Sequence, residues 1–378
     1  MLSKGKRVLV VDIEPTPYVT AYLRKIIQKS RYAVDVVFVS ENLSQPWNED
    51  IADLSATVLS NNSAKAVVEI VSMIWRGDYG AIHLQGWGHP VLATAFVMGL
   101  LKGCPVLSET DTPLPYGLPL YKRLIKRLLY PWLFKIPRYF LPAGSRQAEY
   151  LRYYGVPAKN IIIGKMTVDV DHIKQISVRH RPLERAALRR QYGFVASQTV
   201  FVFVGRLIPE KGVADLLDTF RELCTKNSNI GLLVVGDGAL RSQVERAQAD
   251  TAQIRYAGRV ENKQLLGMLG LADVLVLPSN FEPWGLVVNE AMAAGLAVIA
   301  SDRVGCVDDL VIDGVTGKVF ASGNRDDFRN AVTCMTDSAR AEQCGRQAQS
   351  LISSWTLEDA SGIVTACWES IIPDYNRA

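Results

Sequence analysis

Short apolar runs alternate with segments of helical spacing along most of this chain, and that alternation most constrains its fold. The runs Arg7–Asp12, Val34–Val39 and Ala81–Leu84 are typical of buried strands, while Tyr18–Lys29 and Ala64–Arg76 carry apolar residues at helical spacing. Strands and helices in alternation build a parallel sheet with helices on both faces. We therefore predict an α/β fold made of doubly wound, Rossmann-like sheets.

The alternation lapses between residues 168 and 180 and begins again at Thr199–Val204. A chain of 378 residues is long enough for about two domains. We predict a first domain over residues 1–175, ending with a strand at Asn160–Ile163, and a second domain over residues 176–356. Ligands of such sheets bind at the carboxyl ends of the strands, so a cleft between two facing sheets is the expected site.

The composition limits the compartment and the partners. Six scattered cysteines without a Cys-x-x-Cys pair suit reduced thiols in a cytoplasmic protein. No uncharged apolar run reaches about 18 residues, the length that spans a membrane. The apolar run that follows the basic N-terminal residues is too short for a signal peptide, so we interpret it as a first strand. Residues 1–180 hold 22 Lys and Arg against 14 Asp and Glu, whereas residues 181–378 hold 20 against 24. We expect the basic half to meet an acidic partner, and we predict no nucleic acid.

One segment of the first half, LYKRLIKRLLYPWLFKIPRYFL at residues 120–141, combines basic and apolar residues. Lys122, Arg123, Lys126 and Arg127 recur at helical spacing beside a broad face of Leu, Ile, Trp and Phe. This composition is typical of a helix on an anionic bilayer. The alternative is a core helix with a solvated basic face, because most amphipathic helices pack on their own sheet. A peripheral position on the inner face of the cytoplasmic membrane is therefore a hypothesis.

Glycines and cations follow two strands of the second half. Gly205 ends an apolar run, and Arg206 and Lys211 lie five residues apart in the loop after it. An arginine can bind two oxygens of a diphosphate while a lysine supplies a point charge. Gly236 and Gly238 end the next strand and would let a nucleotide lie against the backbone, although a lone Gly-x-Gly is weak evidence.

A strand–loop–helix unit further on carries two glutamates, Glu282 and Glu290, in Glu-Pro-Trp-Gly-Leu-Val-Val-Asn-Glu. Gly285 lets the backbone approach a ligand, and the helix that begins near Leu286 offers unpaired amide groups to an anion. Standing alone, this stretch would be interpreted as an ordinary capped unit. Paired carboxylates also serve glycosidases as acid and nucleophile. The neighbouring cationic loop argues against a hydrolase, which needs no diphosphate site.

Together these motifs resemble a known family. The stretches GRLIPEKG, GDGALR, PSNFEPWGLVVNEAMAAGLAVIASD and DLVIDGVTGKVF are similar to the donor domain of the retaining family 4 glycosyltransferases (glycosyl transferases group 1), which have the GT-B fold. The first half resembles the acceptor domain of such enzymes more loosely. In that fold the final helix, here Leu357–Ile372, crosses back, so residues 357–378 are expected to join the first domain.

The resemblance implies roles on the donor side. Arg206 and Lys211 would hold the donor diphosphate and stabilise charge on the leaving group, and Glu282 would contact hydroxyls of the transferred sugar. Glu290 would accept hydrogen bonds from the ribose diol. Glycine-rich loops, backbone amides and the expected base site supply the other predicted donor contacts: Gly205, Gly236, Gly238, Arg259, Val260, Gly285, Leu286 and Val287.

The resemblance also implies the reaction. A retaining enzyme of this fold would react on one face of the donor, whose phosphate takes the acceptor proton, without a compulsory metal. No cofactor is expected beyond the nucleotide-sugar co-substrate, a UDP- or GDP-sugar. The acceptor would be a saccharide or a polyprenyl-linked saccharide in polysaccharide or glycoconjugate biosynthesis.

The acceptor side departs from the family pattern. The stretch Glu14–Tyr18 stands where members often carry a glycine pair, and Asp111 stands where many carry a histidine. Asp111 is predicted to contact the sugar or acceptor, or else to cap the next element. Tyr18 and three residues near another strand end, His83, Trp87 and His89, are candidate acceptor contacts. For the histidines and the tryptophan a structural role is the alternative.

Two other functions are weighed against transfer. One is a GT-B epimerase or phosphorylase, against which the Gly-Leu-Val core inside the Glu-x7-Glu motif argues. The other is a non-catalytic nucleotide-sugar-binding protein associated with a membrane. The intact set of Arg206, Lys211, Glu282 and Glu290 argues against such a decayed site.

Overall fold

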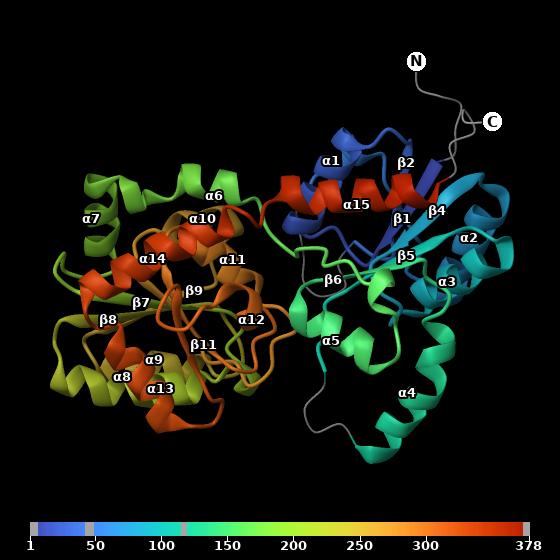
Figure 1. Ribbon diagram of the computed structural model, residues 1–378. Helices are drawn as coiled ribbons and strands as arrows, with labels where there is room; N and C mark the ends of the chain where they lie inside the picture. The colour runs from blue at the N-terminus through green and yellow to red at the C-terminus, as the bar shows by residue number, and fades with distance from the viewer. Residues whose placement is uncertain (1–6, 42–48, 115–118, 373–378) are drawn as a thin grey trace. The chain divides into compact units, whose positions relative to one another are not determined.

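The computed structural model describes residues 7–41, 49–114 and 119–372, and the chain divides into two compact units (Figure 1). Unit 1 contains Met1–Val168 together with Leu357–Ala378, and unit 2 contains Asp169–Thr356. The chain therefore leaves unit 1 once and returns to it for its last helix, as the resemblance implied. The boundary lies at Val168, ahead of the one predicted near residue 175.

Unit 1 is built on a parallel six-stranded sheet with the strand order β3-β2-β1-β4-β5-β6. Its strands are β1 (Arg7–Asp12), β2 (Val34–Phe38), β3 (Thr57–Val58), β4 (Tyr79–Leu84), β5 (Val106–Thr110) and β6 (Tyr139–Pro142). Its α-helices are α1 (Pro17–Lys29), α2 (Ser63–Arg76), α3 (Pro90–Lys102), α4 (Leu120–Leu133), α5 (Ser145–Tyr153) and α15 (Leu357–Ile371). Val8 and Val10 pack with α1 and α15, whereas Leu9 and Val11 pack with α2 and α3. Both faces of the sheet are covered, as the two-residue period of a strand requires.

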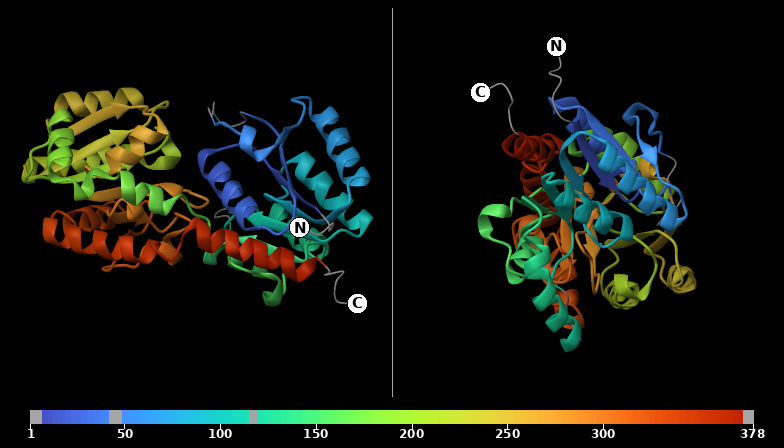
Figure 2. Two further views of the ribbon diagram at one scale, coloured as in Figure 1. Left: turned by 90° about the horizontal axis from the view of Figure 1, so that it is seen from above. Right: turned by 90° about the vertical axis from the view of Figure 1, so that its right-hand side faces the viewer.

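Unit 2 repeats this plan with the strand order β12-β11-β10-β7-β8-β9. Its strands are β7 (Thr199–Val204), β8 (Ile230–Val235), β9 (Ile254–Gly258), β10 (Val274–Leu277), β11 (Ala297–Ser301) and β12 (Gly317–Phe320). Its α-helices are α6 (Val170–Ile176), α7 (Pro182–Gln191), α8 (Val213–Lys226), α9 (Arg241–Asp250), α10 (Asn262–Leu269), α11 (Leu286–Ala293), α12 (Val307–Leu310), α13 (Arg325–Cys334) and α14 (Ser338–Ile352). Phe201 and Phe203 pack with α8, α9 and α13, and the residue between them, Val202, is also buried. Figure 2 shows helices on both sides of each sheet. The predicted doubly wound α/β architecture is therefore confirmed.

The last helix belongs to the core of unit 1. Val364 and Trp368 of α15 are fully buried in the cluster that holds Leu23 and Ile26 of α1. At the start of the helix, Lys29 Nζ donates to the carbonyl oxygen of Glu358 at 2.9 Å. An apolar face of α15 thus completes one side of the first sheet, which explains why the chain returns to it.

Two local predictions near the boundary are wrong. Asn160–Ile163 is not a strand, because Ile161 forms only an isolated bridge to Phe140 after a 3₁₀ turn. Helix α6 lies where the alternation lapses, and it is capped by Asp169, whose Oδ1 accepts from His172 N at 3.0 Å. Seven residues are too few for a clear helical period. Because α6 packs on α10 and α11, it belongs to unit 2.

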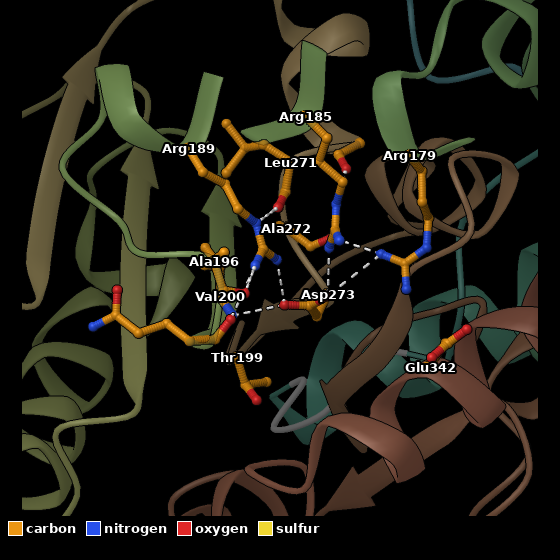
Figure 3. Close-up of polar contacts among 12 residues, drawn as sticks. Arg179, Arg185, Arg189, Ala196, Thr199, Val200, Leu271, Ala272, Asp273 and Glu342 are labelled. Atoms are coloured by element: carbon orange, nitrogen blue, oxygen red, sulfur yellow. Dashed lines mark hydrogen bonds and ion pairs between the residues drawn. The ribbon is translucent and has the colours of Figure 1, made fainter. Parts of the chain in front are cut away.

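Three arginines around Asp273 anchor the segment that leads into β7 (Figure 3). Arg185 and Arg189 donate to the Asp273 carboxylate at 2.5 and 2.6 Å, and Arg179 lies 3.6 Å from it. Asp273 Oδ2 also accepts from Val200 N at 2.8 Å. The remaining guanidinium contacts are to backbone carbonyls of Ala196, Gln198, Gly270, Leu271 and Ala272. Buried charges are stable only when paired in this way, so the cluster fixes α7 to β7 and β10.

Candidate functional site

The strand order of unit 2 creates a topological switch point between β7 and β10. From β7 the chain continues to β8 and β9 on one side, and it returns to β10, β11 and β12 on the other. Ligands of open parallel sheets bind outside the strand ends at such a point. The loop after β7 contains the predicted diphosphate residues and the loop after β10 contains Glu282, so both motifs begin at the same place.

Backbone contacts lock these two loops together. Asn280 N in the second loop donates to Glu210 O in the first at 2.8 Å. Gly212 has a φ of 68°, and a Cβ added there would lie 2.1 Å from the carbonyl oxygen of Pro278. Only glycine can occupy this position without moving the loops apart. The distance between the two motifs is therefore set by main chain, not by side chains alone.

The loop that carries Glu282 is also fixed by contacts with the loop after β11, with α11 and with Trp355. Gly305 N, in the loop after β11, donates to Glu282 O at 2.9 Å. Trp284 is buried, its Nε1 donates to Asn289 Oδ1 at 3.0 Å, and its ring stacks on Trp355 at 5.9 Å. Sequence reasoning missed this anchor, although Trp284 stands inside the glutamate motif. It holds Glu282 in place relative to the start of α11.

Lys211 and Glu282 form an ion pair across the switch point. Their side chains are only 15% and 16% exposed. Arg206, five residues before Lys211, is exposed, and its guanidinium has no hydrogen bond or ion pair with any residue that the structure describes. The loop after β7 therefore contains one cation without a partner among the described residues and one cation held by a carboxylate. That set can bind a diphosphate and a hydroxyl group side by side.

The carboxyl group of Glu290, on α11, has no hydrogen-bond or ion-pair partner among the described residues. Burial raises the pKa of its carboxyl to about 7. Gly285, with a φ of 99°, begins the helix, and the first amides, those of Leu286 and Val287, stand at its N-terminus. A carboxyl group kept in a poorly solvated place without a protein donor is suited to accept hydrogen bonds from a ligand.

Gly236 and Gly238 have a structural reason that the sequence did not reveal. Gly236 has a φ of 138°, and a Cβ there would lie 1.9 Å from Gly205 O. At Gly238 a Cβ would lie 2.6 Å from Leu207 O. These glycines let the loop after β8 pack directly on the loop after β7. Their contact with a nucleotide stays a prediction.

The predicted base site follows the edge strand β9. Arg259 and Val260 come directly after this strand, and Arg259 is exposed. Strand β9 is two positions from β7, which is about 10 Å at the usual strand spacing. That separation suits the distance from a diphosphate to the far end of a nucleoside, so the placement agrees in scale with the predicted role.

Unit 1 has a pocket between α1 and the carboxyl ends of β4, β5 and β6. Tyr18 and Asp111, both predicted on the acceptor side, line this pocket. Asp111 is exposed, and the next described helix, α4, begins at Leu120, so Asp111 caps no described helix. The structure brings these two candidates together, and their contact with an acceptor stays a prediction.

A polar network around Glu109 borders the same pocket, and sequence reasoning missed it. Tyr22 Oη donates to Glu109 Oε1 at 3.0 Å, and His83 Nε2 lies 3.0 Å from the same oxygen. Burial, with Glu109 and Glu14 nearby, raises the pKa of Asp12 to about 7. Two signals were available: Glu109 lies two residues before Asp111, and Tyr22 lies one helical turn after Tyr18.

The other three acceptor candidates make structural contacts. His83 is buried and packs edge-on against Trp368 at 5.7 Å, behind Glu109. Trp87 packs edge-on against Phe134 at 5.0 Å. His89 caps α3, where its Nδ1 accepts from Val91 N at 3.2 Å. None of the three is among the residues that line the pocket, so the geometry favours the structural alternative for each.

The charge of the pocket differs from that of the first half as a whole. Its charged lining residues are Glu109, Asp111 and Lys165. Two carboxylates and one ammonium suit the hydroxyl groups of a saccharide better than a diphosphate. The basic surplus of the first half lies partly elsewhere, because four of its cations are on α4.

The described residues contain no group of three or more His, Cys, Asp or Glu side chains that could hold a metal ion. An Asp-x-Asp sequence, Asp169-Val170-Asp171, has the spacing used by metal-dependent sugar transferases. Here Asp169 caps α6.

Residues 184–351 match the family model described as glycosyl transferases group 1. These residues belong to that family. The group 1 domain contains Arg206, Lys211, Glu282 and Glu290, so the resemblance stated from the sequence motifs is confirmed.

Two curated relatives are similar to parts of the chain. The lipopolysaccharide 1,2-N-acetylglucosaminetransferase of Salmonella typhimurium is 34% identical over 179 residues, which cover 44% of this chain and 47% of the relative. The D-inositol 3-phosphate glycosyltransferase of Rhodococcus jostii is 26% identical over 295 residues, which cover 74% of this chain and 61% of the relative. The chain thus spans about half to two thirds of the length of these relatives.

The whole chain is similar in structure to HepE of Anabaena, crystallised in complex with UDP and glucose. The TM-score is 0.76 at 18% identity, over 97% of this chain and 100% of that one. At this identity the likeness establishes the fold. The two units are the Rossmann-like domains of the GT-B fold.

Proposed function

We propose that this chain is a retaining glycosyltransferase that moves a sugar from a nucleotide-sugar donor to a saccharide or lipid-linked saccharide acceptor. The observation that carries the proposal is the Lys211–Glu282 pair at the switch point of the group 1 domain, in the same loop of which Arg206 has no ion-pair partner among the described residues. Cations suit the departing nucleoside diphosphate, and a carboxylate suits sugar hydroxyls. The relatives named as sugar transferases support the same activity.

Lys211 and Glu282 neutralise each other and hold both side chains at the strand ends. A bound donor would exchange this pair for two ligand contacts, Lys211 with the diphosphate and Glu282 with a sugar hydroxyl. Arg206 would add a second cation to the diphosphate, and Glu290 would accept from the ribose diol. The HepE complex with UDP supports a uridine nucleotide as donor component.

Transfer would break the bond between the anomeric carbon and the donor phosphate oxygen. The acceptor oxygen would bond to the same face of that carbon, and its proton would pass to the leaving phosphate. Lys211 and Arg206 would stabilise the charge that grows on the diphosphate, so neither a metal nor a cofactor is part of the proposal. Glu282, which would contact a hydroxyl of the transferred sugar, would orient that sugar and would not act as a nucleophile.

The acceptor would bind at the pocket of unit 1, where Tyr18, Glu109 and Asp111 offer partners for hydroxyl groups. A saccharide fits this lining, and a lipid carrier would extend from it. We place the protein in the cytoplasm, peripheral to the inner face of the cytoplasmic membrane, because a lipid-linked acceptor would be held there.

A thermal-shift panel tests the proposal. We expect UDP or GDP, and the matching nucleotide sugars, to raise the unfolding midpoint of the chain, because a ligand that binds only the folded state stabilises it. AMP and free glucose are the controls and should leave the midpoint unchanged. A panel in which no nucleoside diphosphate shifts the midpoint at millimolar concentration would overturn the proposal.

Glu290→Gln should weaken the binding of the whole nucleotide. A carboxylate that accepts from the ribose diol is worth about 1.5–3 kcal/mol, or roughly 10- to 100-fold in the dissociation constant. Calorimetric titration with the free nucleoside diphosphate measures this loss. Glu342→Gln, an exposed glutamate paired with Arg346, is the matched control and should bind as the wild type does. Equal affinities for both variants would remove Glu290 from the site.

The same variant should be more stable than the wild type when no ligand is present. The pKa of Glu290 is about 7 in the folded chain against an ordinary 4.5, so the stability that this group contributes is lost as the pH rises between these values. Glutamine avoids the buried charge. We expect Glu290→Gln to unfold at a higher temperature than the wild type at pH 8, with a smaller difference at pH 5. A variant less stable than the wild type at pH 8 would contradict the raised pKa.

A further inference from the structure

Helix α4 turns its apolar face away from the protein. Leu120, Tyr121, Leu124, Ile125, Leu128, Leu129 and Trp132 are between 51% and 73% exposed, and no residue of the helix is buried. Positions three and four apart share a helix face, so these side chains form one continuous stripe. A helix of a domain normally buries such a stripe against its own sheet. Figure 1 shows α4 extending from the edge of unit 1.

The opposite side and the C-terminal end attach α4 to unit 1. Tyr130 packs on Phe134 and Tyr154 at 4.7 and 5.1 Å between ring centroids. Phe134, just after the helix, is buried against Phe140 at 5.1 Å. Lys126 Nζ lies 5.4 Å from the Tyr130 ring. These aromatic contacts fix the helix so that its leucine stripe faces outward.

The charges around the stripe are all positive. Lys122 and Arg127 lie on either side of it, and Arg123 and Lys126 lie further round the helix. Residues 120–134 contain no Asp or Glu. None of these four cations forms an ion pair with a residue in the ranges that the structure describes. An apolar stripe between unpaired cations matches a surface that is apolar inside and anionic at its edge.

We propose that α4 lies in the interface of an anionic lipid bilayer, with its leucine and tryptophan stripe among the acyl chains and its lysines and arginines at the headgroups. This proposal rests on the proposed function and deepens it, because it names the surface that would bring the enzyme to a lipid-linked acceptor. Across the described ranges, no helix is long and apolar enough to cross a membrane, so α4 would lie along the surface.

A second copy of the chain is a poorer occupant of this face. Two α4 helices packed together would bring eight cations close to one another without a single carboxylate from either helix. Like charges at such distances repel. An anionic bilayer removes this repulsion and covers the apolar stripe at the same time.

Vesicle flotation tests the inference with the full chain. The wild type should float with vesicles of phosphatidylcholine and phosphatidylglycerol, and less with phosphatidylcholine alone. The variant Leu124→Ser/Leu128→Ser/Trp132→Ser should lose at least about tenfold in its partition coefficient, because three interfacial apolar side chains are removed. Lys122→Glu/Arg127→Glu should lose about tenfold or more on the anionic vesicles. All five side chains are exposed, so the fold should be kept.

Matched controls show whether the loss of vesicle binding is specific to α4 or follows from any change in net charge or any loss of an exposed apolar side chain. Arg190→Glu/Arg246→Glu changes the net charge equally on exposed residues of unit 2, and Leu183→Ser removes a leucine that is 87% exposed. Both should float as the wild type does. Wild type that stays unbound on anionic vesicles, or α4 variants that bind like these controls, would overturn the inference. A change of oligomeric state in the α4 variants, seen by light scattering, would instead assign the face to a second copy and also overturn it.

Failure of this inference and failure of the proposed function are distinguishable. Lys211→Ala should float as the wild type does, because Lys211 is in unit 2. The triple α4 variant should keep the thermal shift with nucleoside diphosphates. Loss of both properties in the triple variant would mean that α4 supports the fold, which would overturn the docking role.

Discussion

Replacing Lys211 by alanine should lower the turnover of the nucleotide-sugar donor by about 10²- to 10³-fold, the loss seen when one charge-stabilising contact is removed from an active site. The physical reason is specific to this geometry. Lys211 is the cation that main-chain contacts fix at the switch point between β7 and β10, beside Glu282. Without it, the charge that develops on the leaving diphosphate is met by Arg206 alone, and Glu282 loses the partner that holds it.

The measurement is the release of nucleoside diphosphate from whichever donor of the UDP and GDP panel shifts the wild type most. Lys226→Ala is the matched control, since it removes a lysine from an ion pair with Glu222 on the exposed end of α8. The control should turn over at the wild-type rate. Lys211→Ala with near-normal turnover would remove the central residue of the proposed function.

Asp273→Asn should destabilise unit 2 by about 3–5 kcal/mol, the cost of breaking a buried ion pair by removing one partner. The carboxylate of Asp273 is contacted by three guanidinium groups and accepts from Val200 N. Burial lowers the pKa of Arg179 and of Arg189, and Asp273 is what opposes that effect. An asparagine keeps the shape of the side chain but removes the negative charge that these arginines share, which leaves only Glu342 to act on Arg179.

Urea denaturation compares this variant with Asp326→Asn, which loses an exposed ion pair to Arg329 on α13. Exposed pairs contribute about 0–1 kcal/mol, so the control should unfold close to the wild type. Nucleoside diphosphates should still raise the unfolding midpoint of Asp273→Asn, since the cluster lies away from the residues proposed to bind the donor. A loss below about 1 kcal/mol would show that the backbone carbonyls suffice to hold the arginines.

Local periodicity predicted the elements well where they are long and strongly patterned. The strands Arg7–Asp12 and Thr199–Val204 are present as predicted, and the helices predicted at Tyr18–Lys29 and Ala64–Arg76 each begin one residue earlier in the structure. The short helix α6 and the false strand at Asn160–Ile163 show the limit. Whether such a short segment forms a helix or a strand depends on the residues that it packs on, and a window of local sequence does not contain them.

The structure brings together more of the residues predicted for the donor side than of those predicted for the acceptor side. Arg206, Lys211, Glu282 and Glu290 stand in motifs whose spacing is recognisable, and the structure brings Lys211 and Glu282 into contact. On the acceptor side, Tyr18 and Asp111 line one pocket, but His83, Trp87 and His89 serve packing and capping. A histidine near a strand end has the same local sequence in either role, so only its neighbours distinguish them.

The α/β architecture and the family of the second unit could be inferred from the sequence, because they depend on period, spacing and residue type. The donor-side residues were predicted from the same motifs. Tertiary structure alone decided which loops meet. Main-chain contact at Gly212 and Gly236 sets the donor loops against one another. Packing placed Glu109 at the pocket of unit 1 and turned the leucine stripe of α4 outward. Such contacts join residues far apart in the chain, and no local pattern encodes the distance between them.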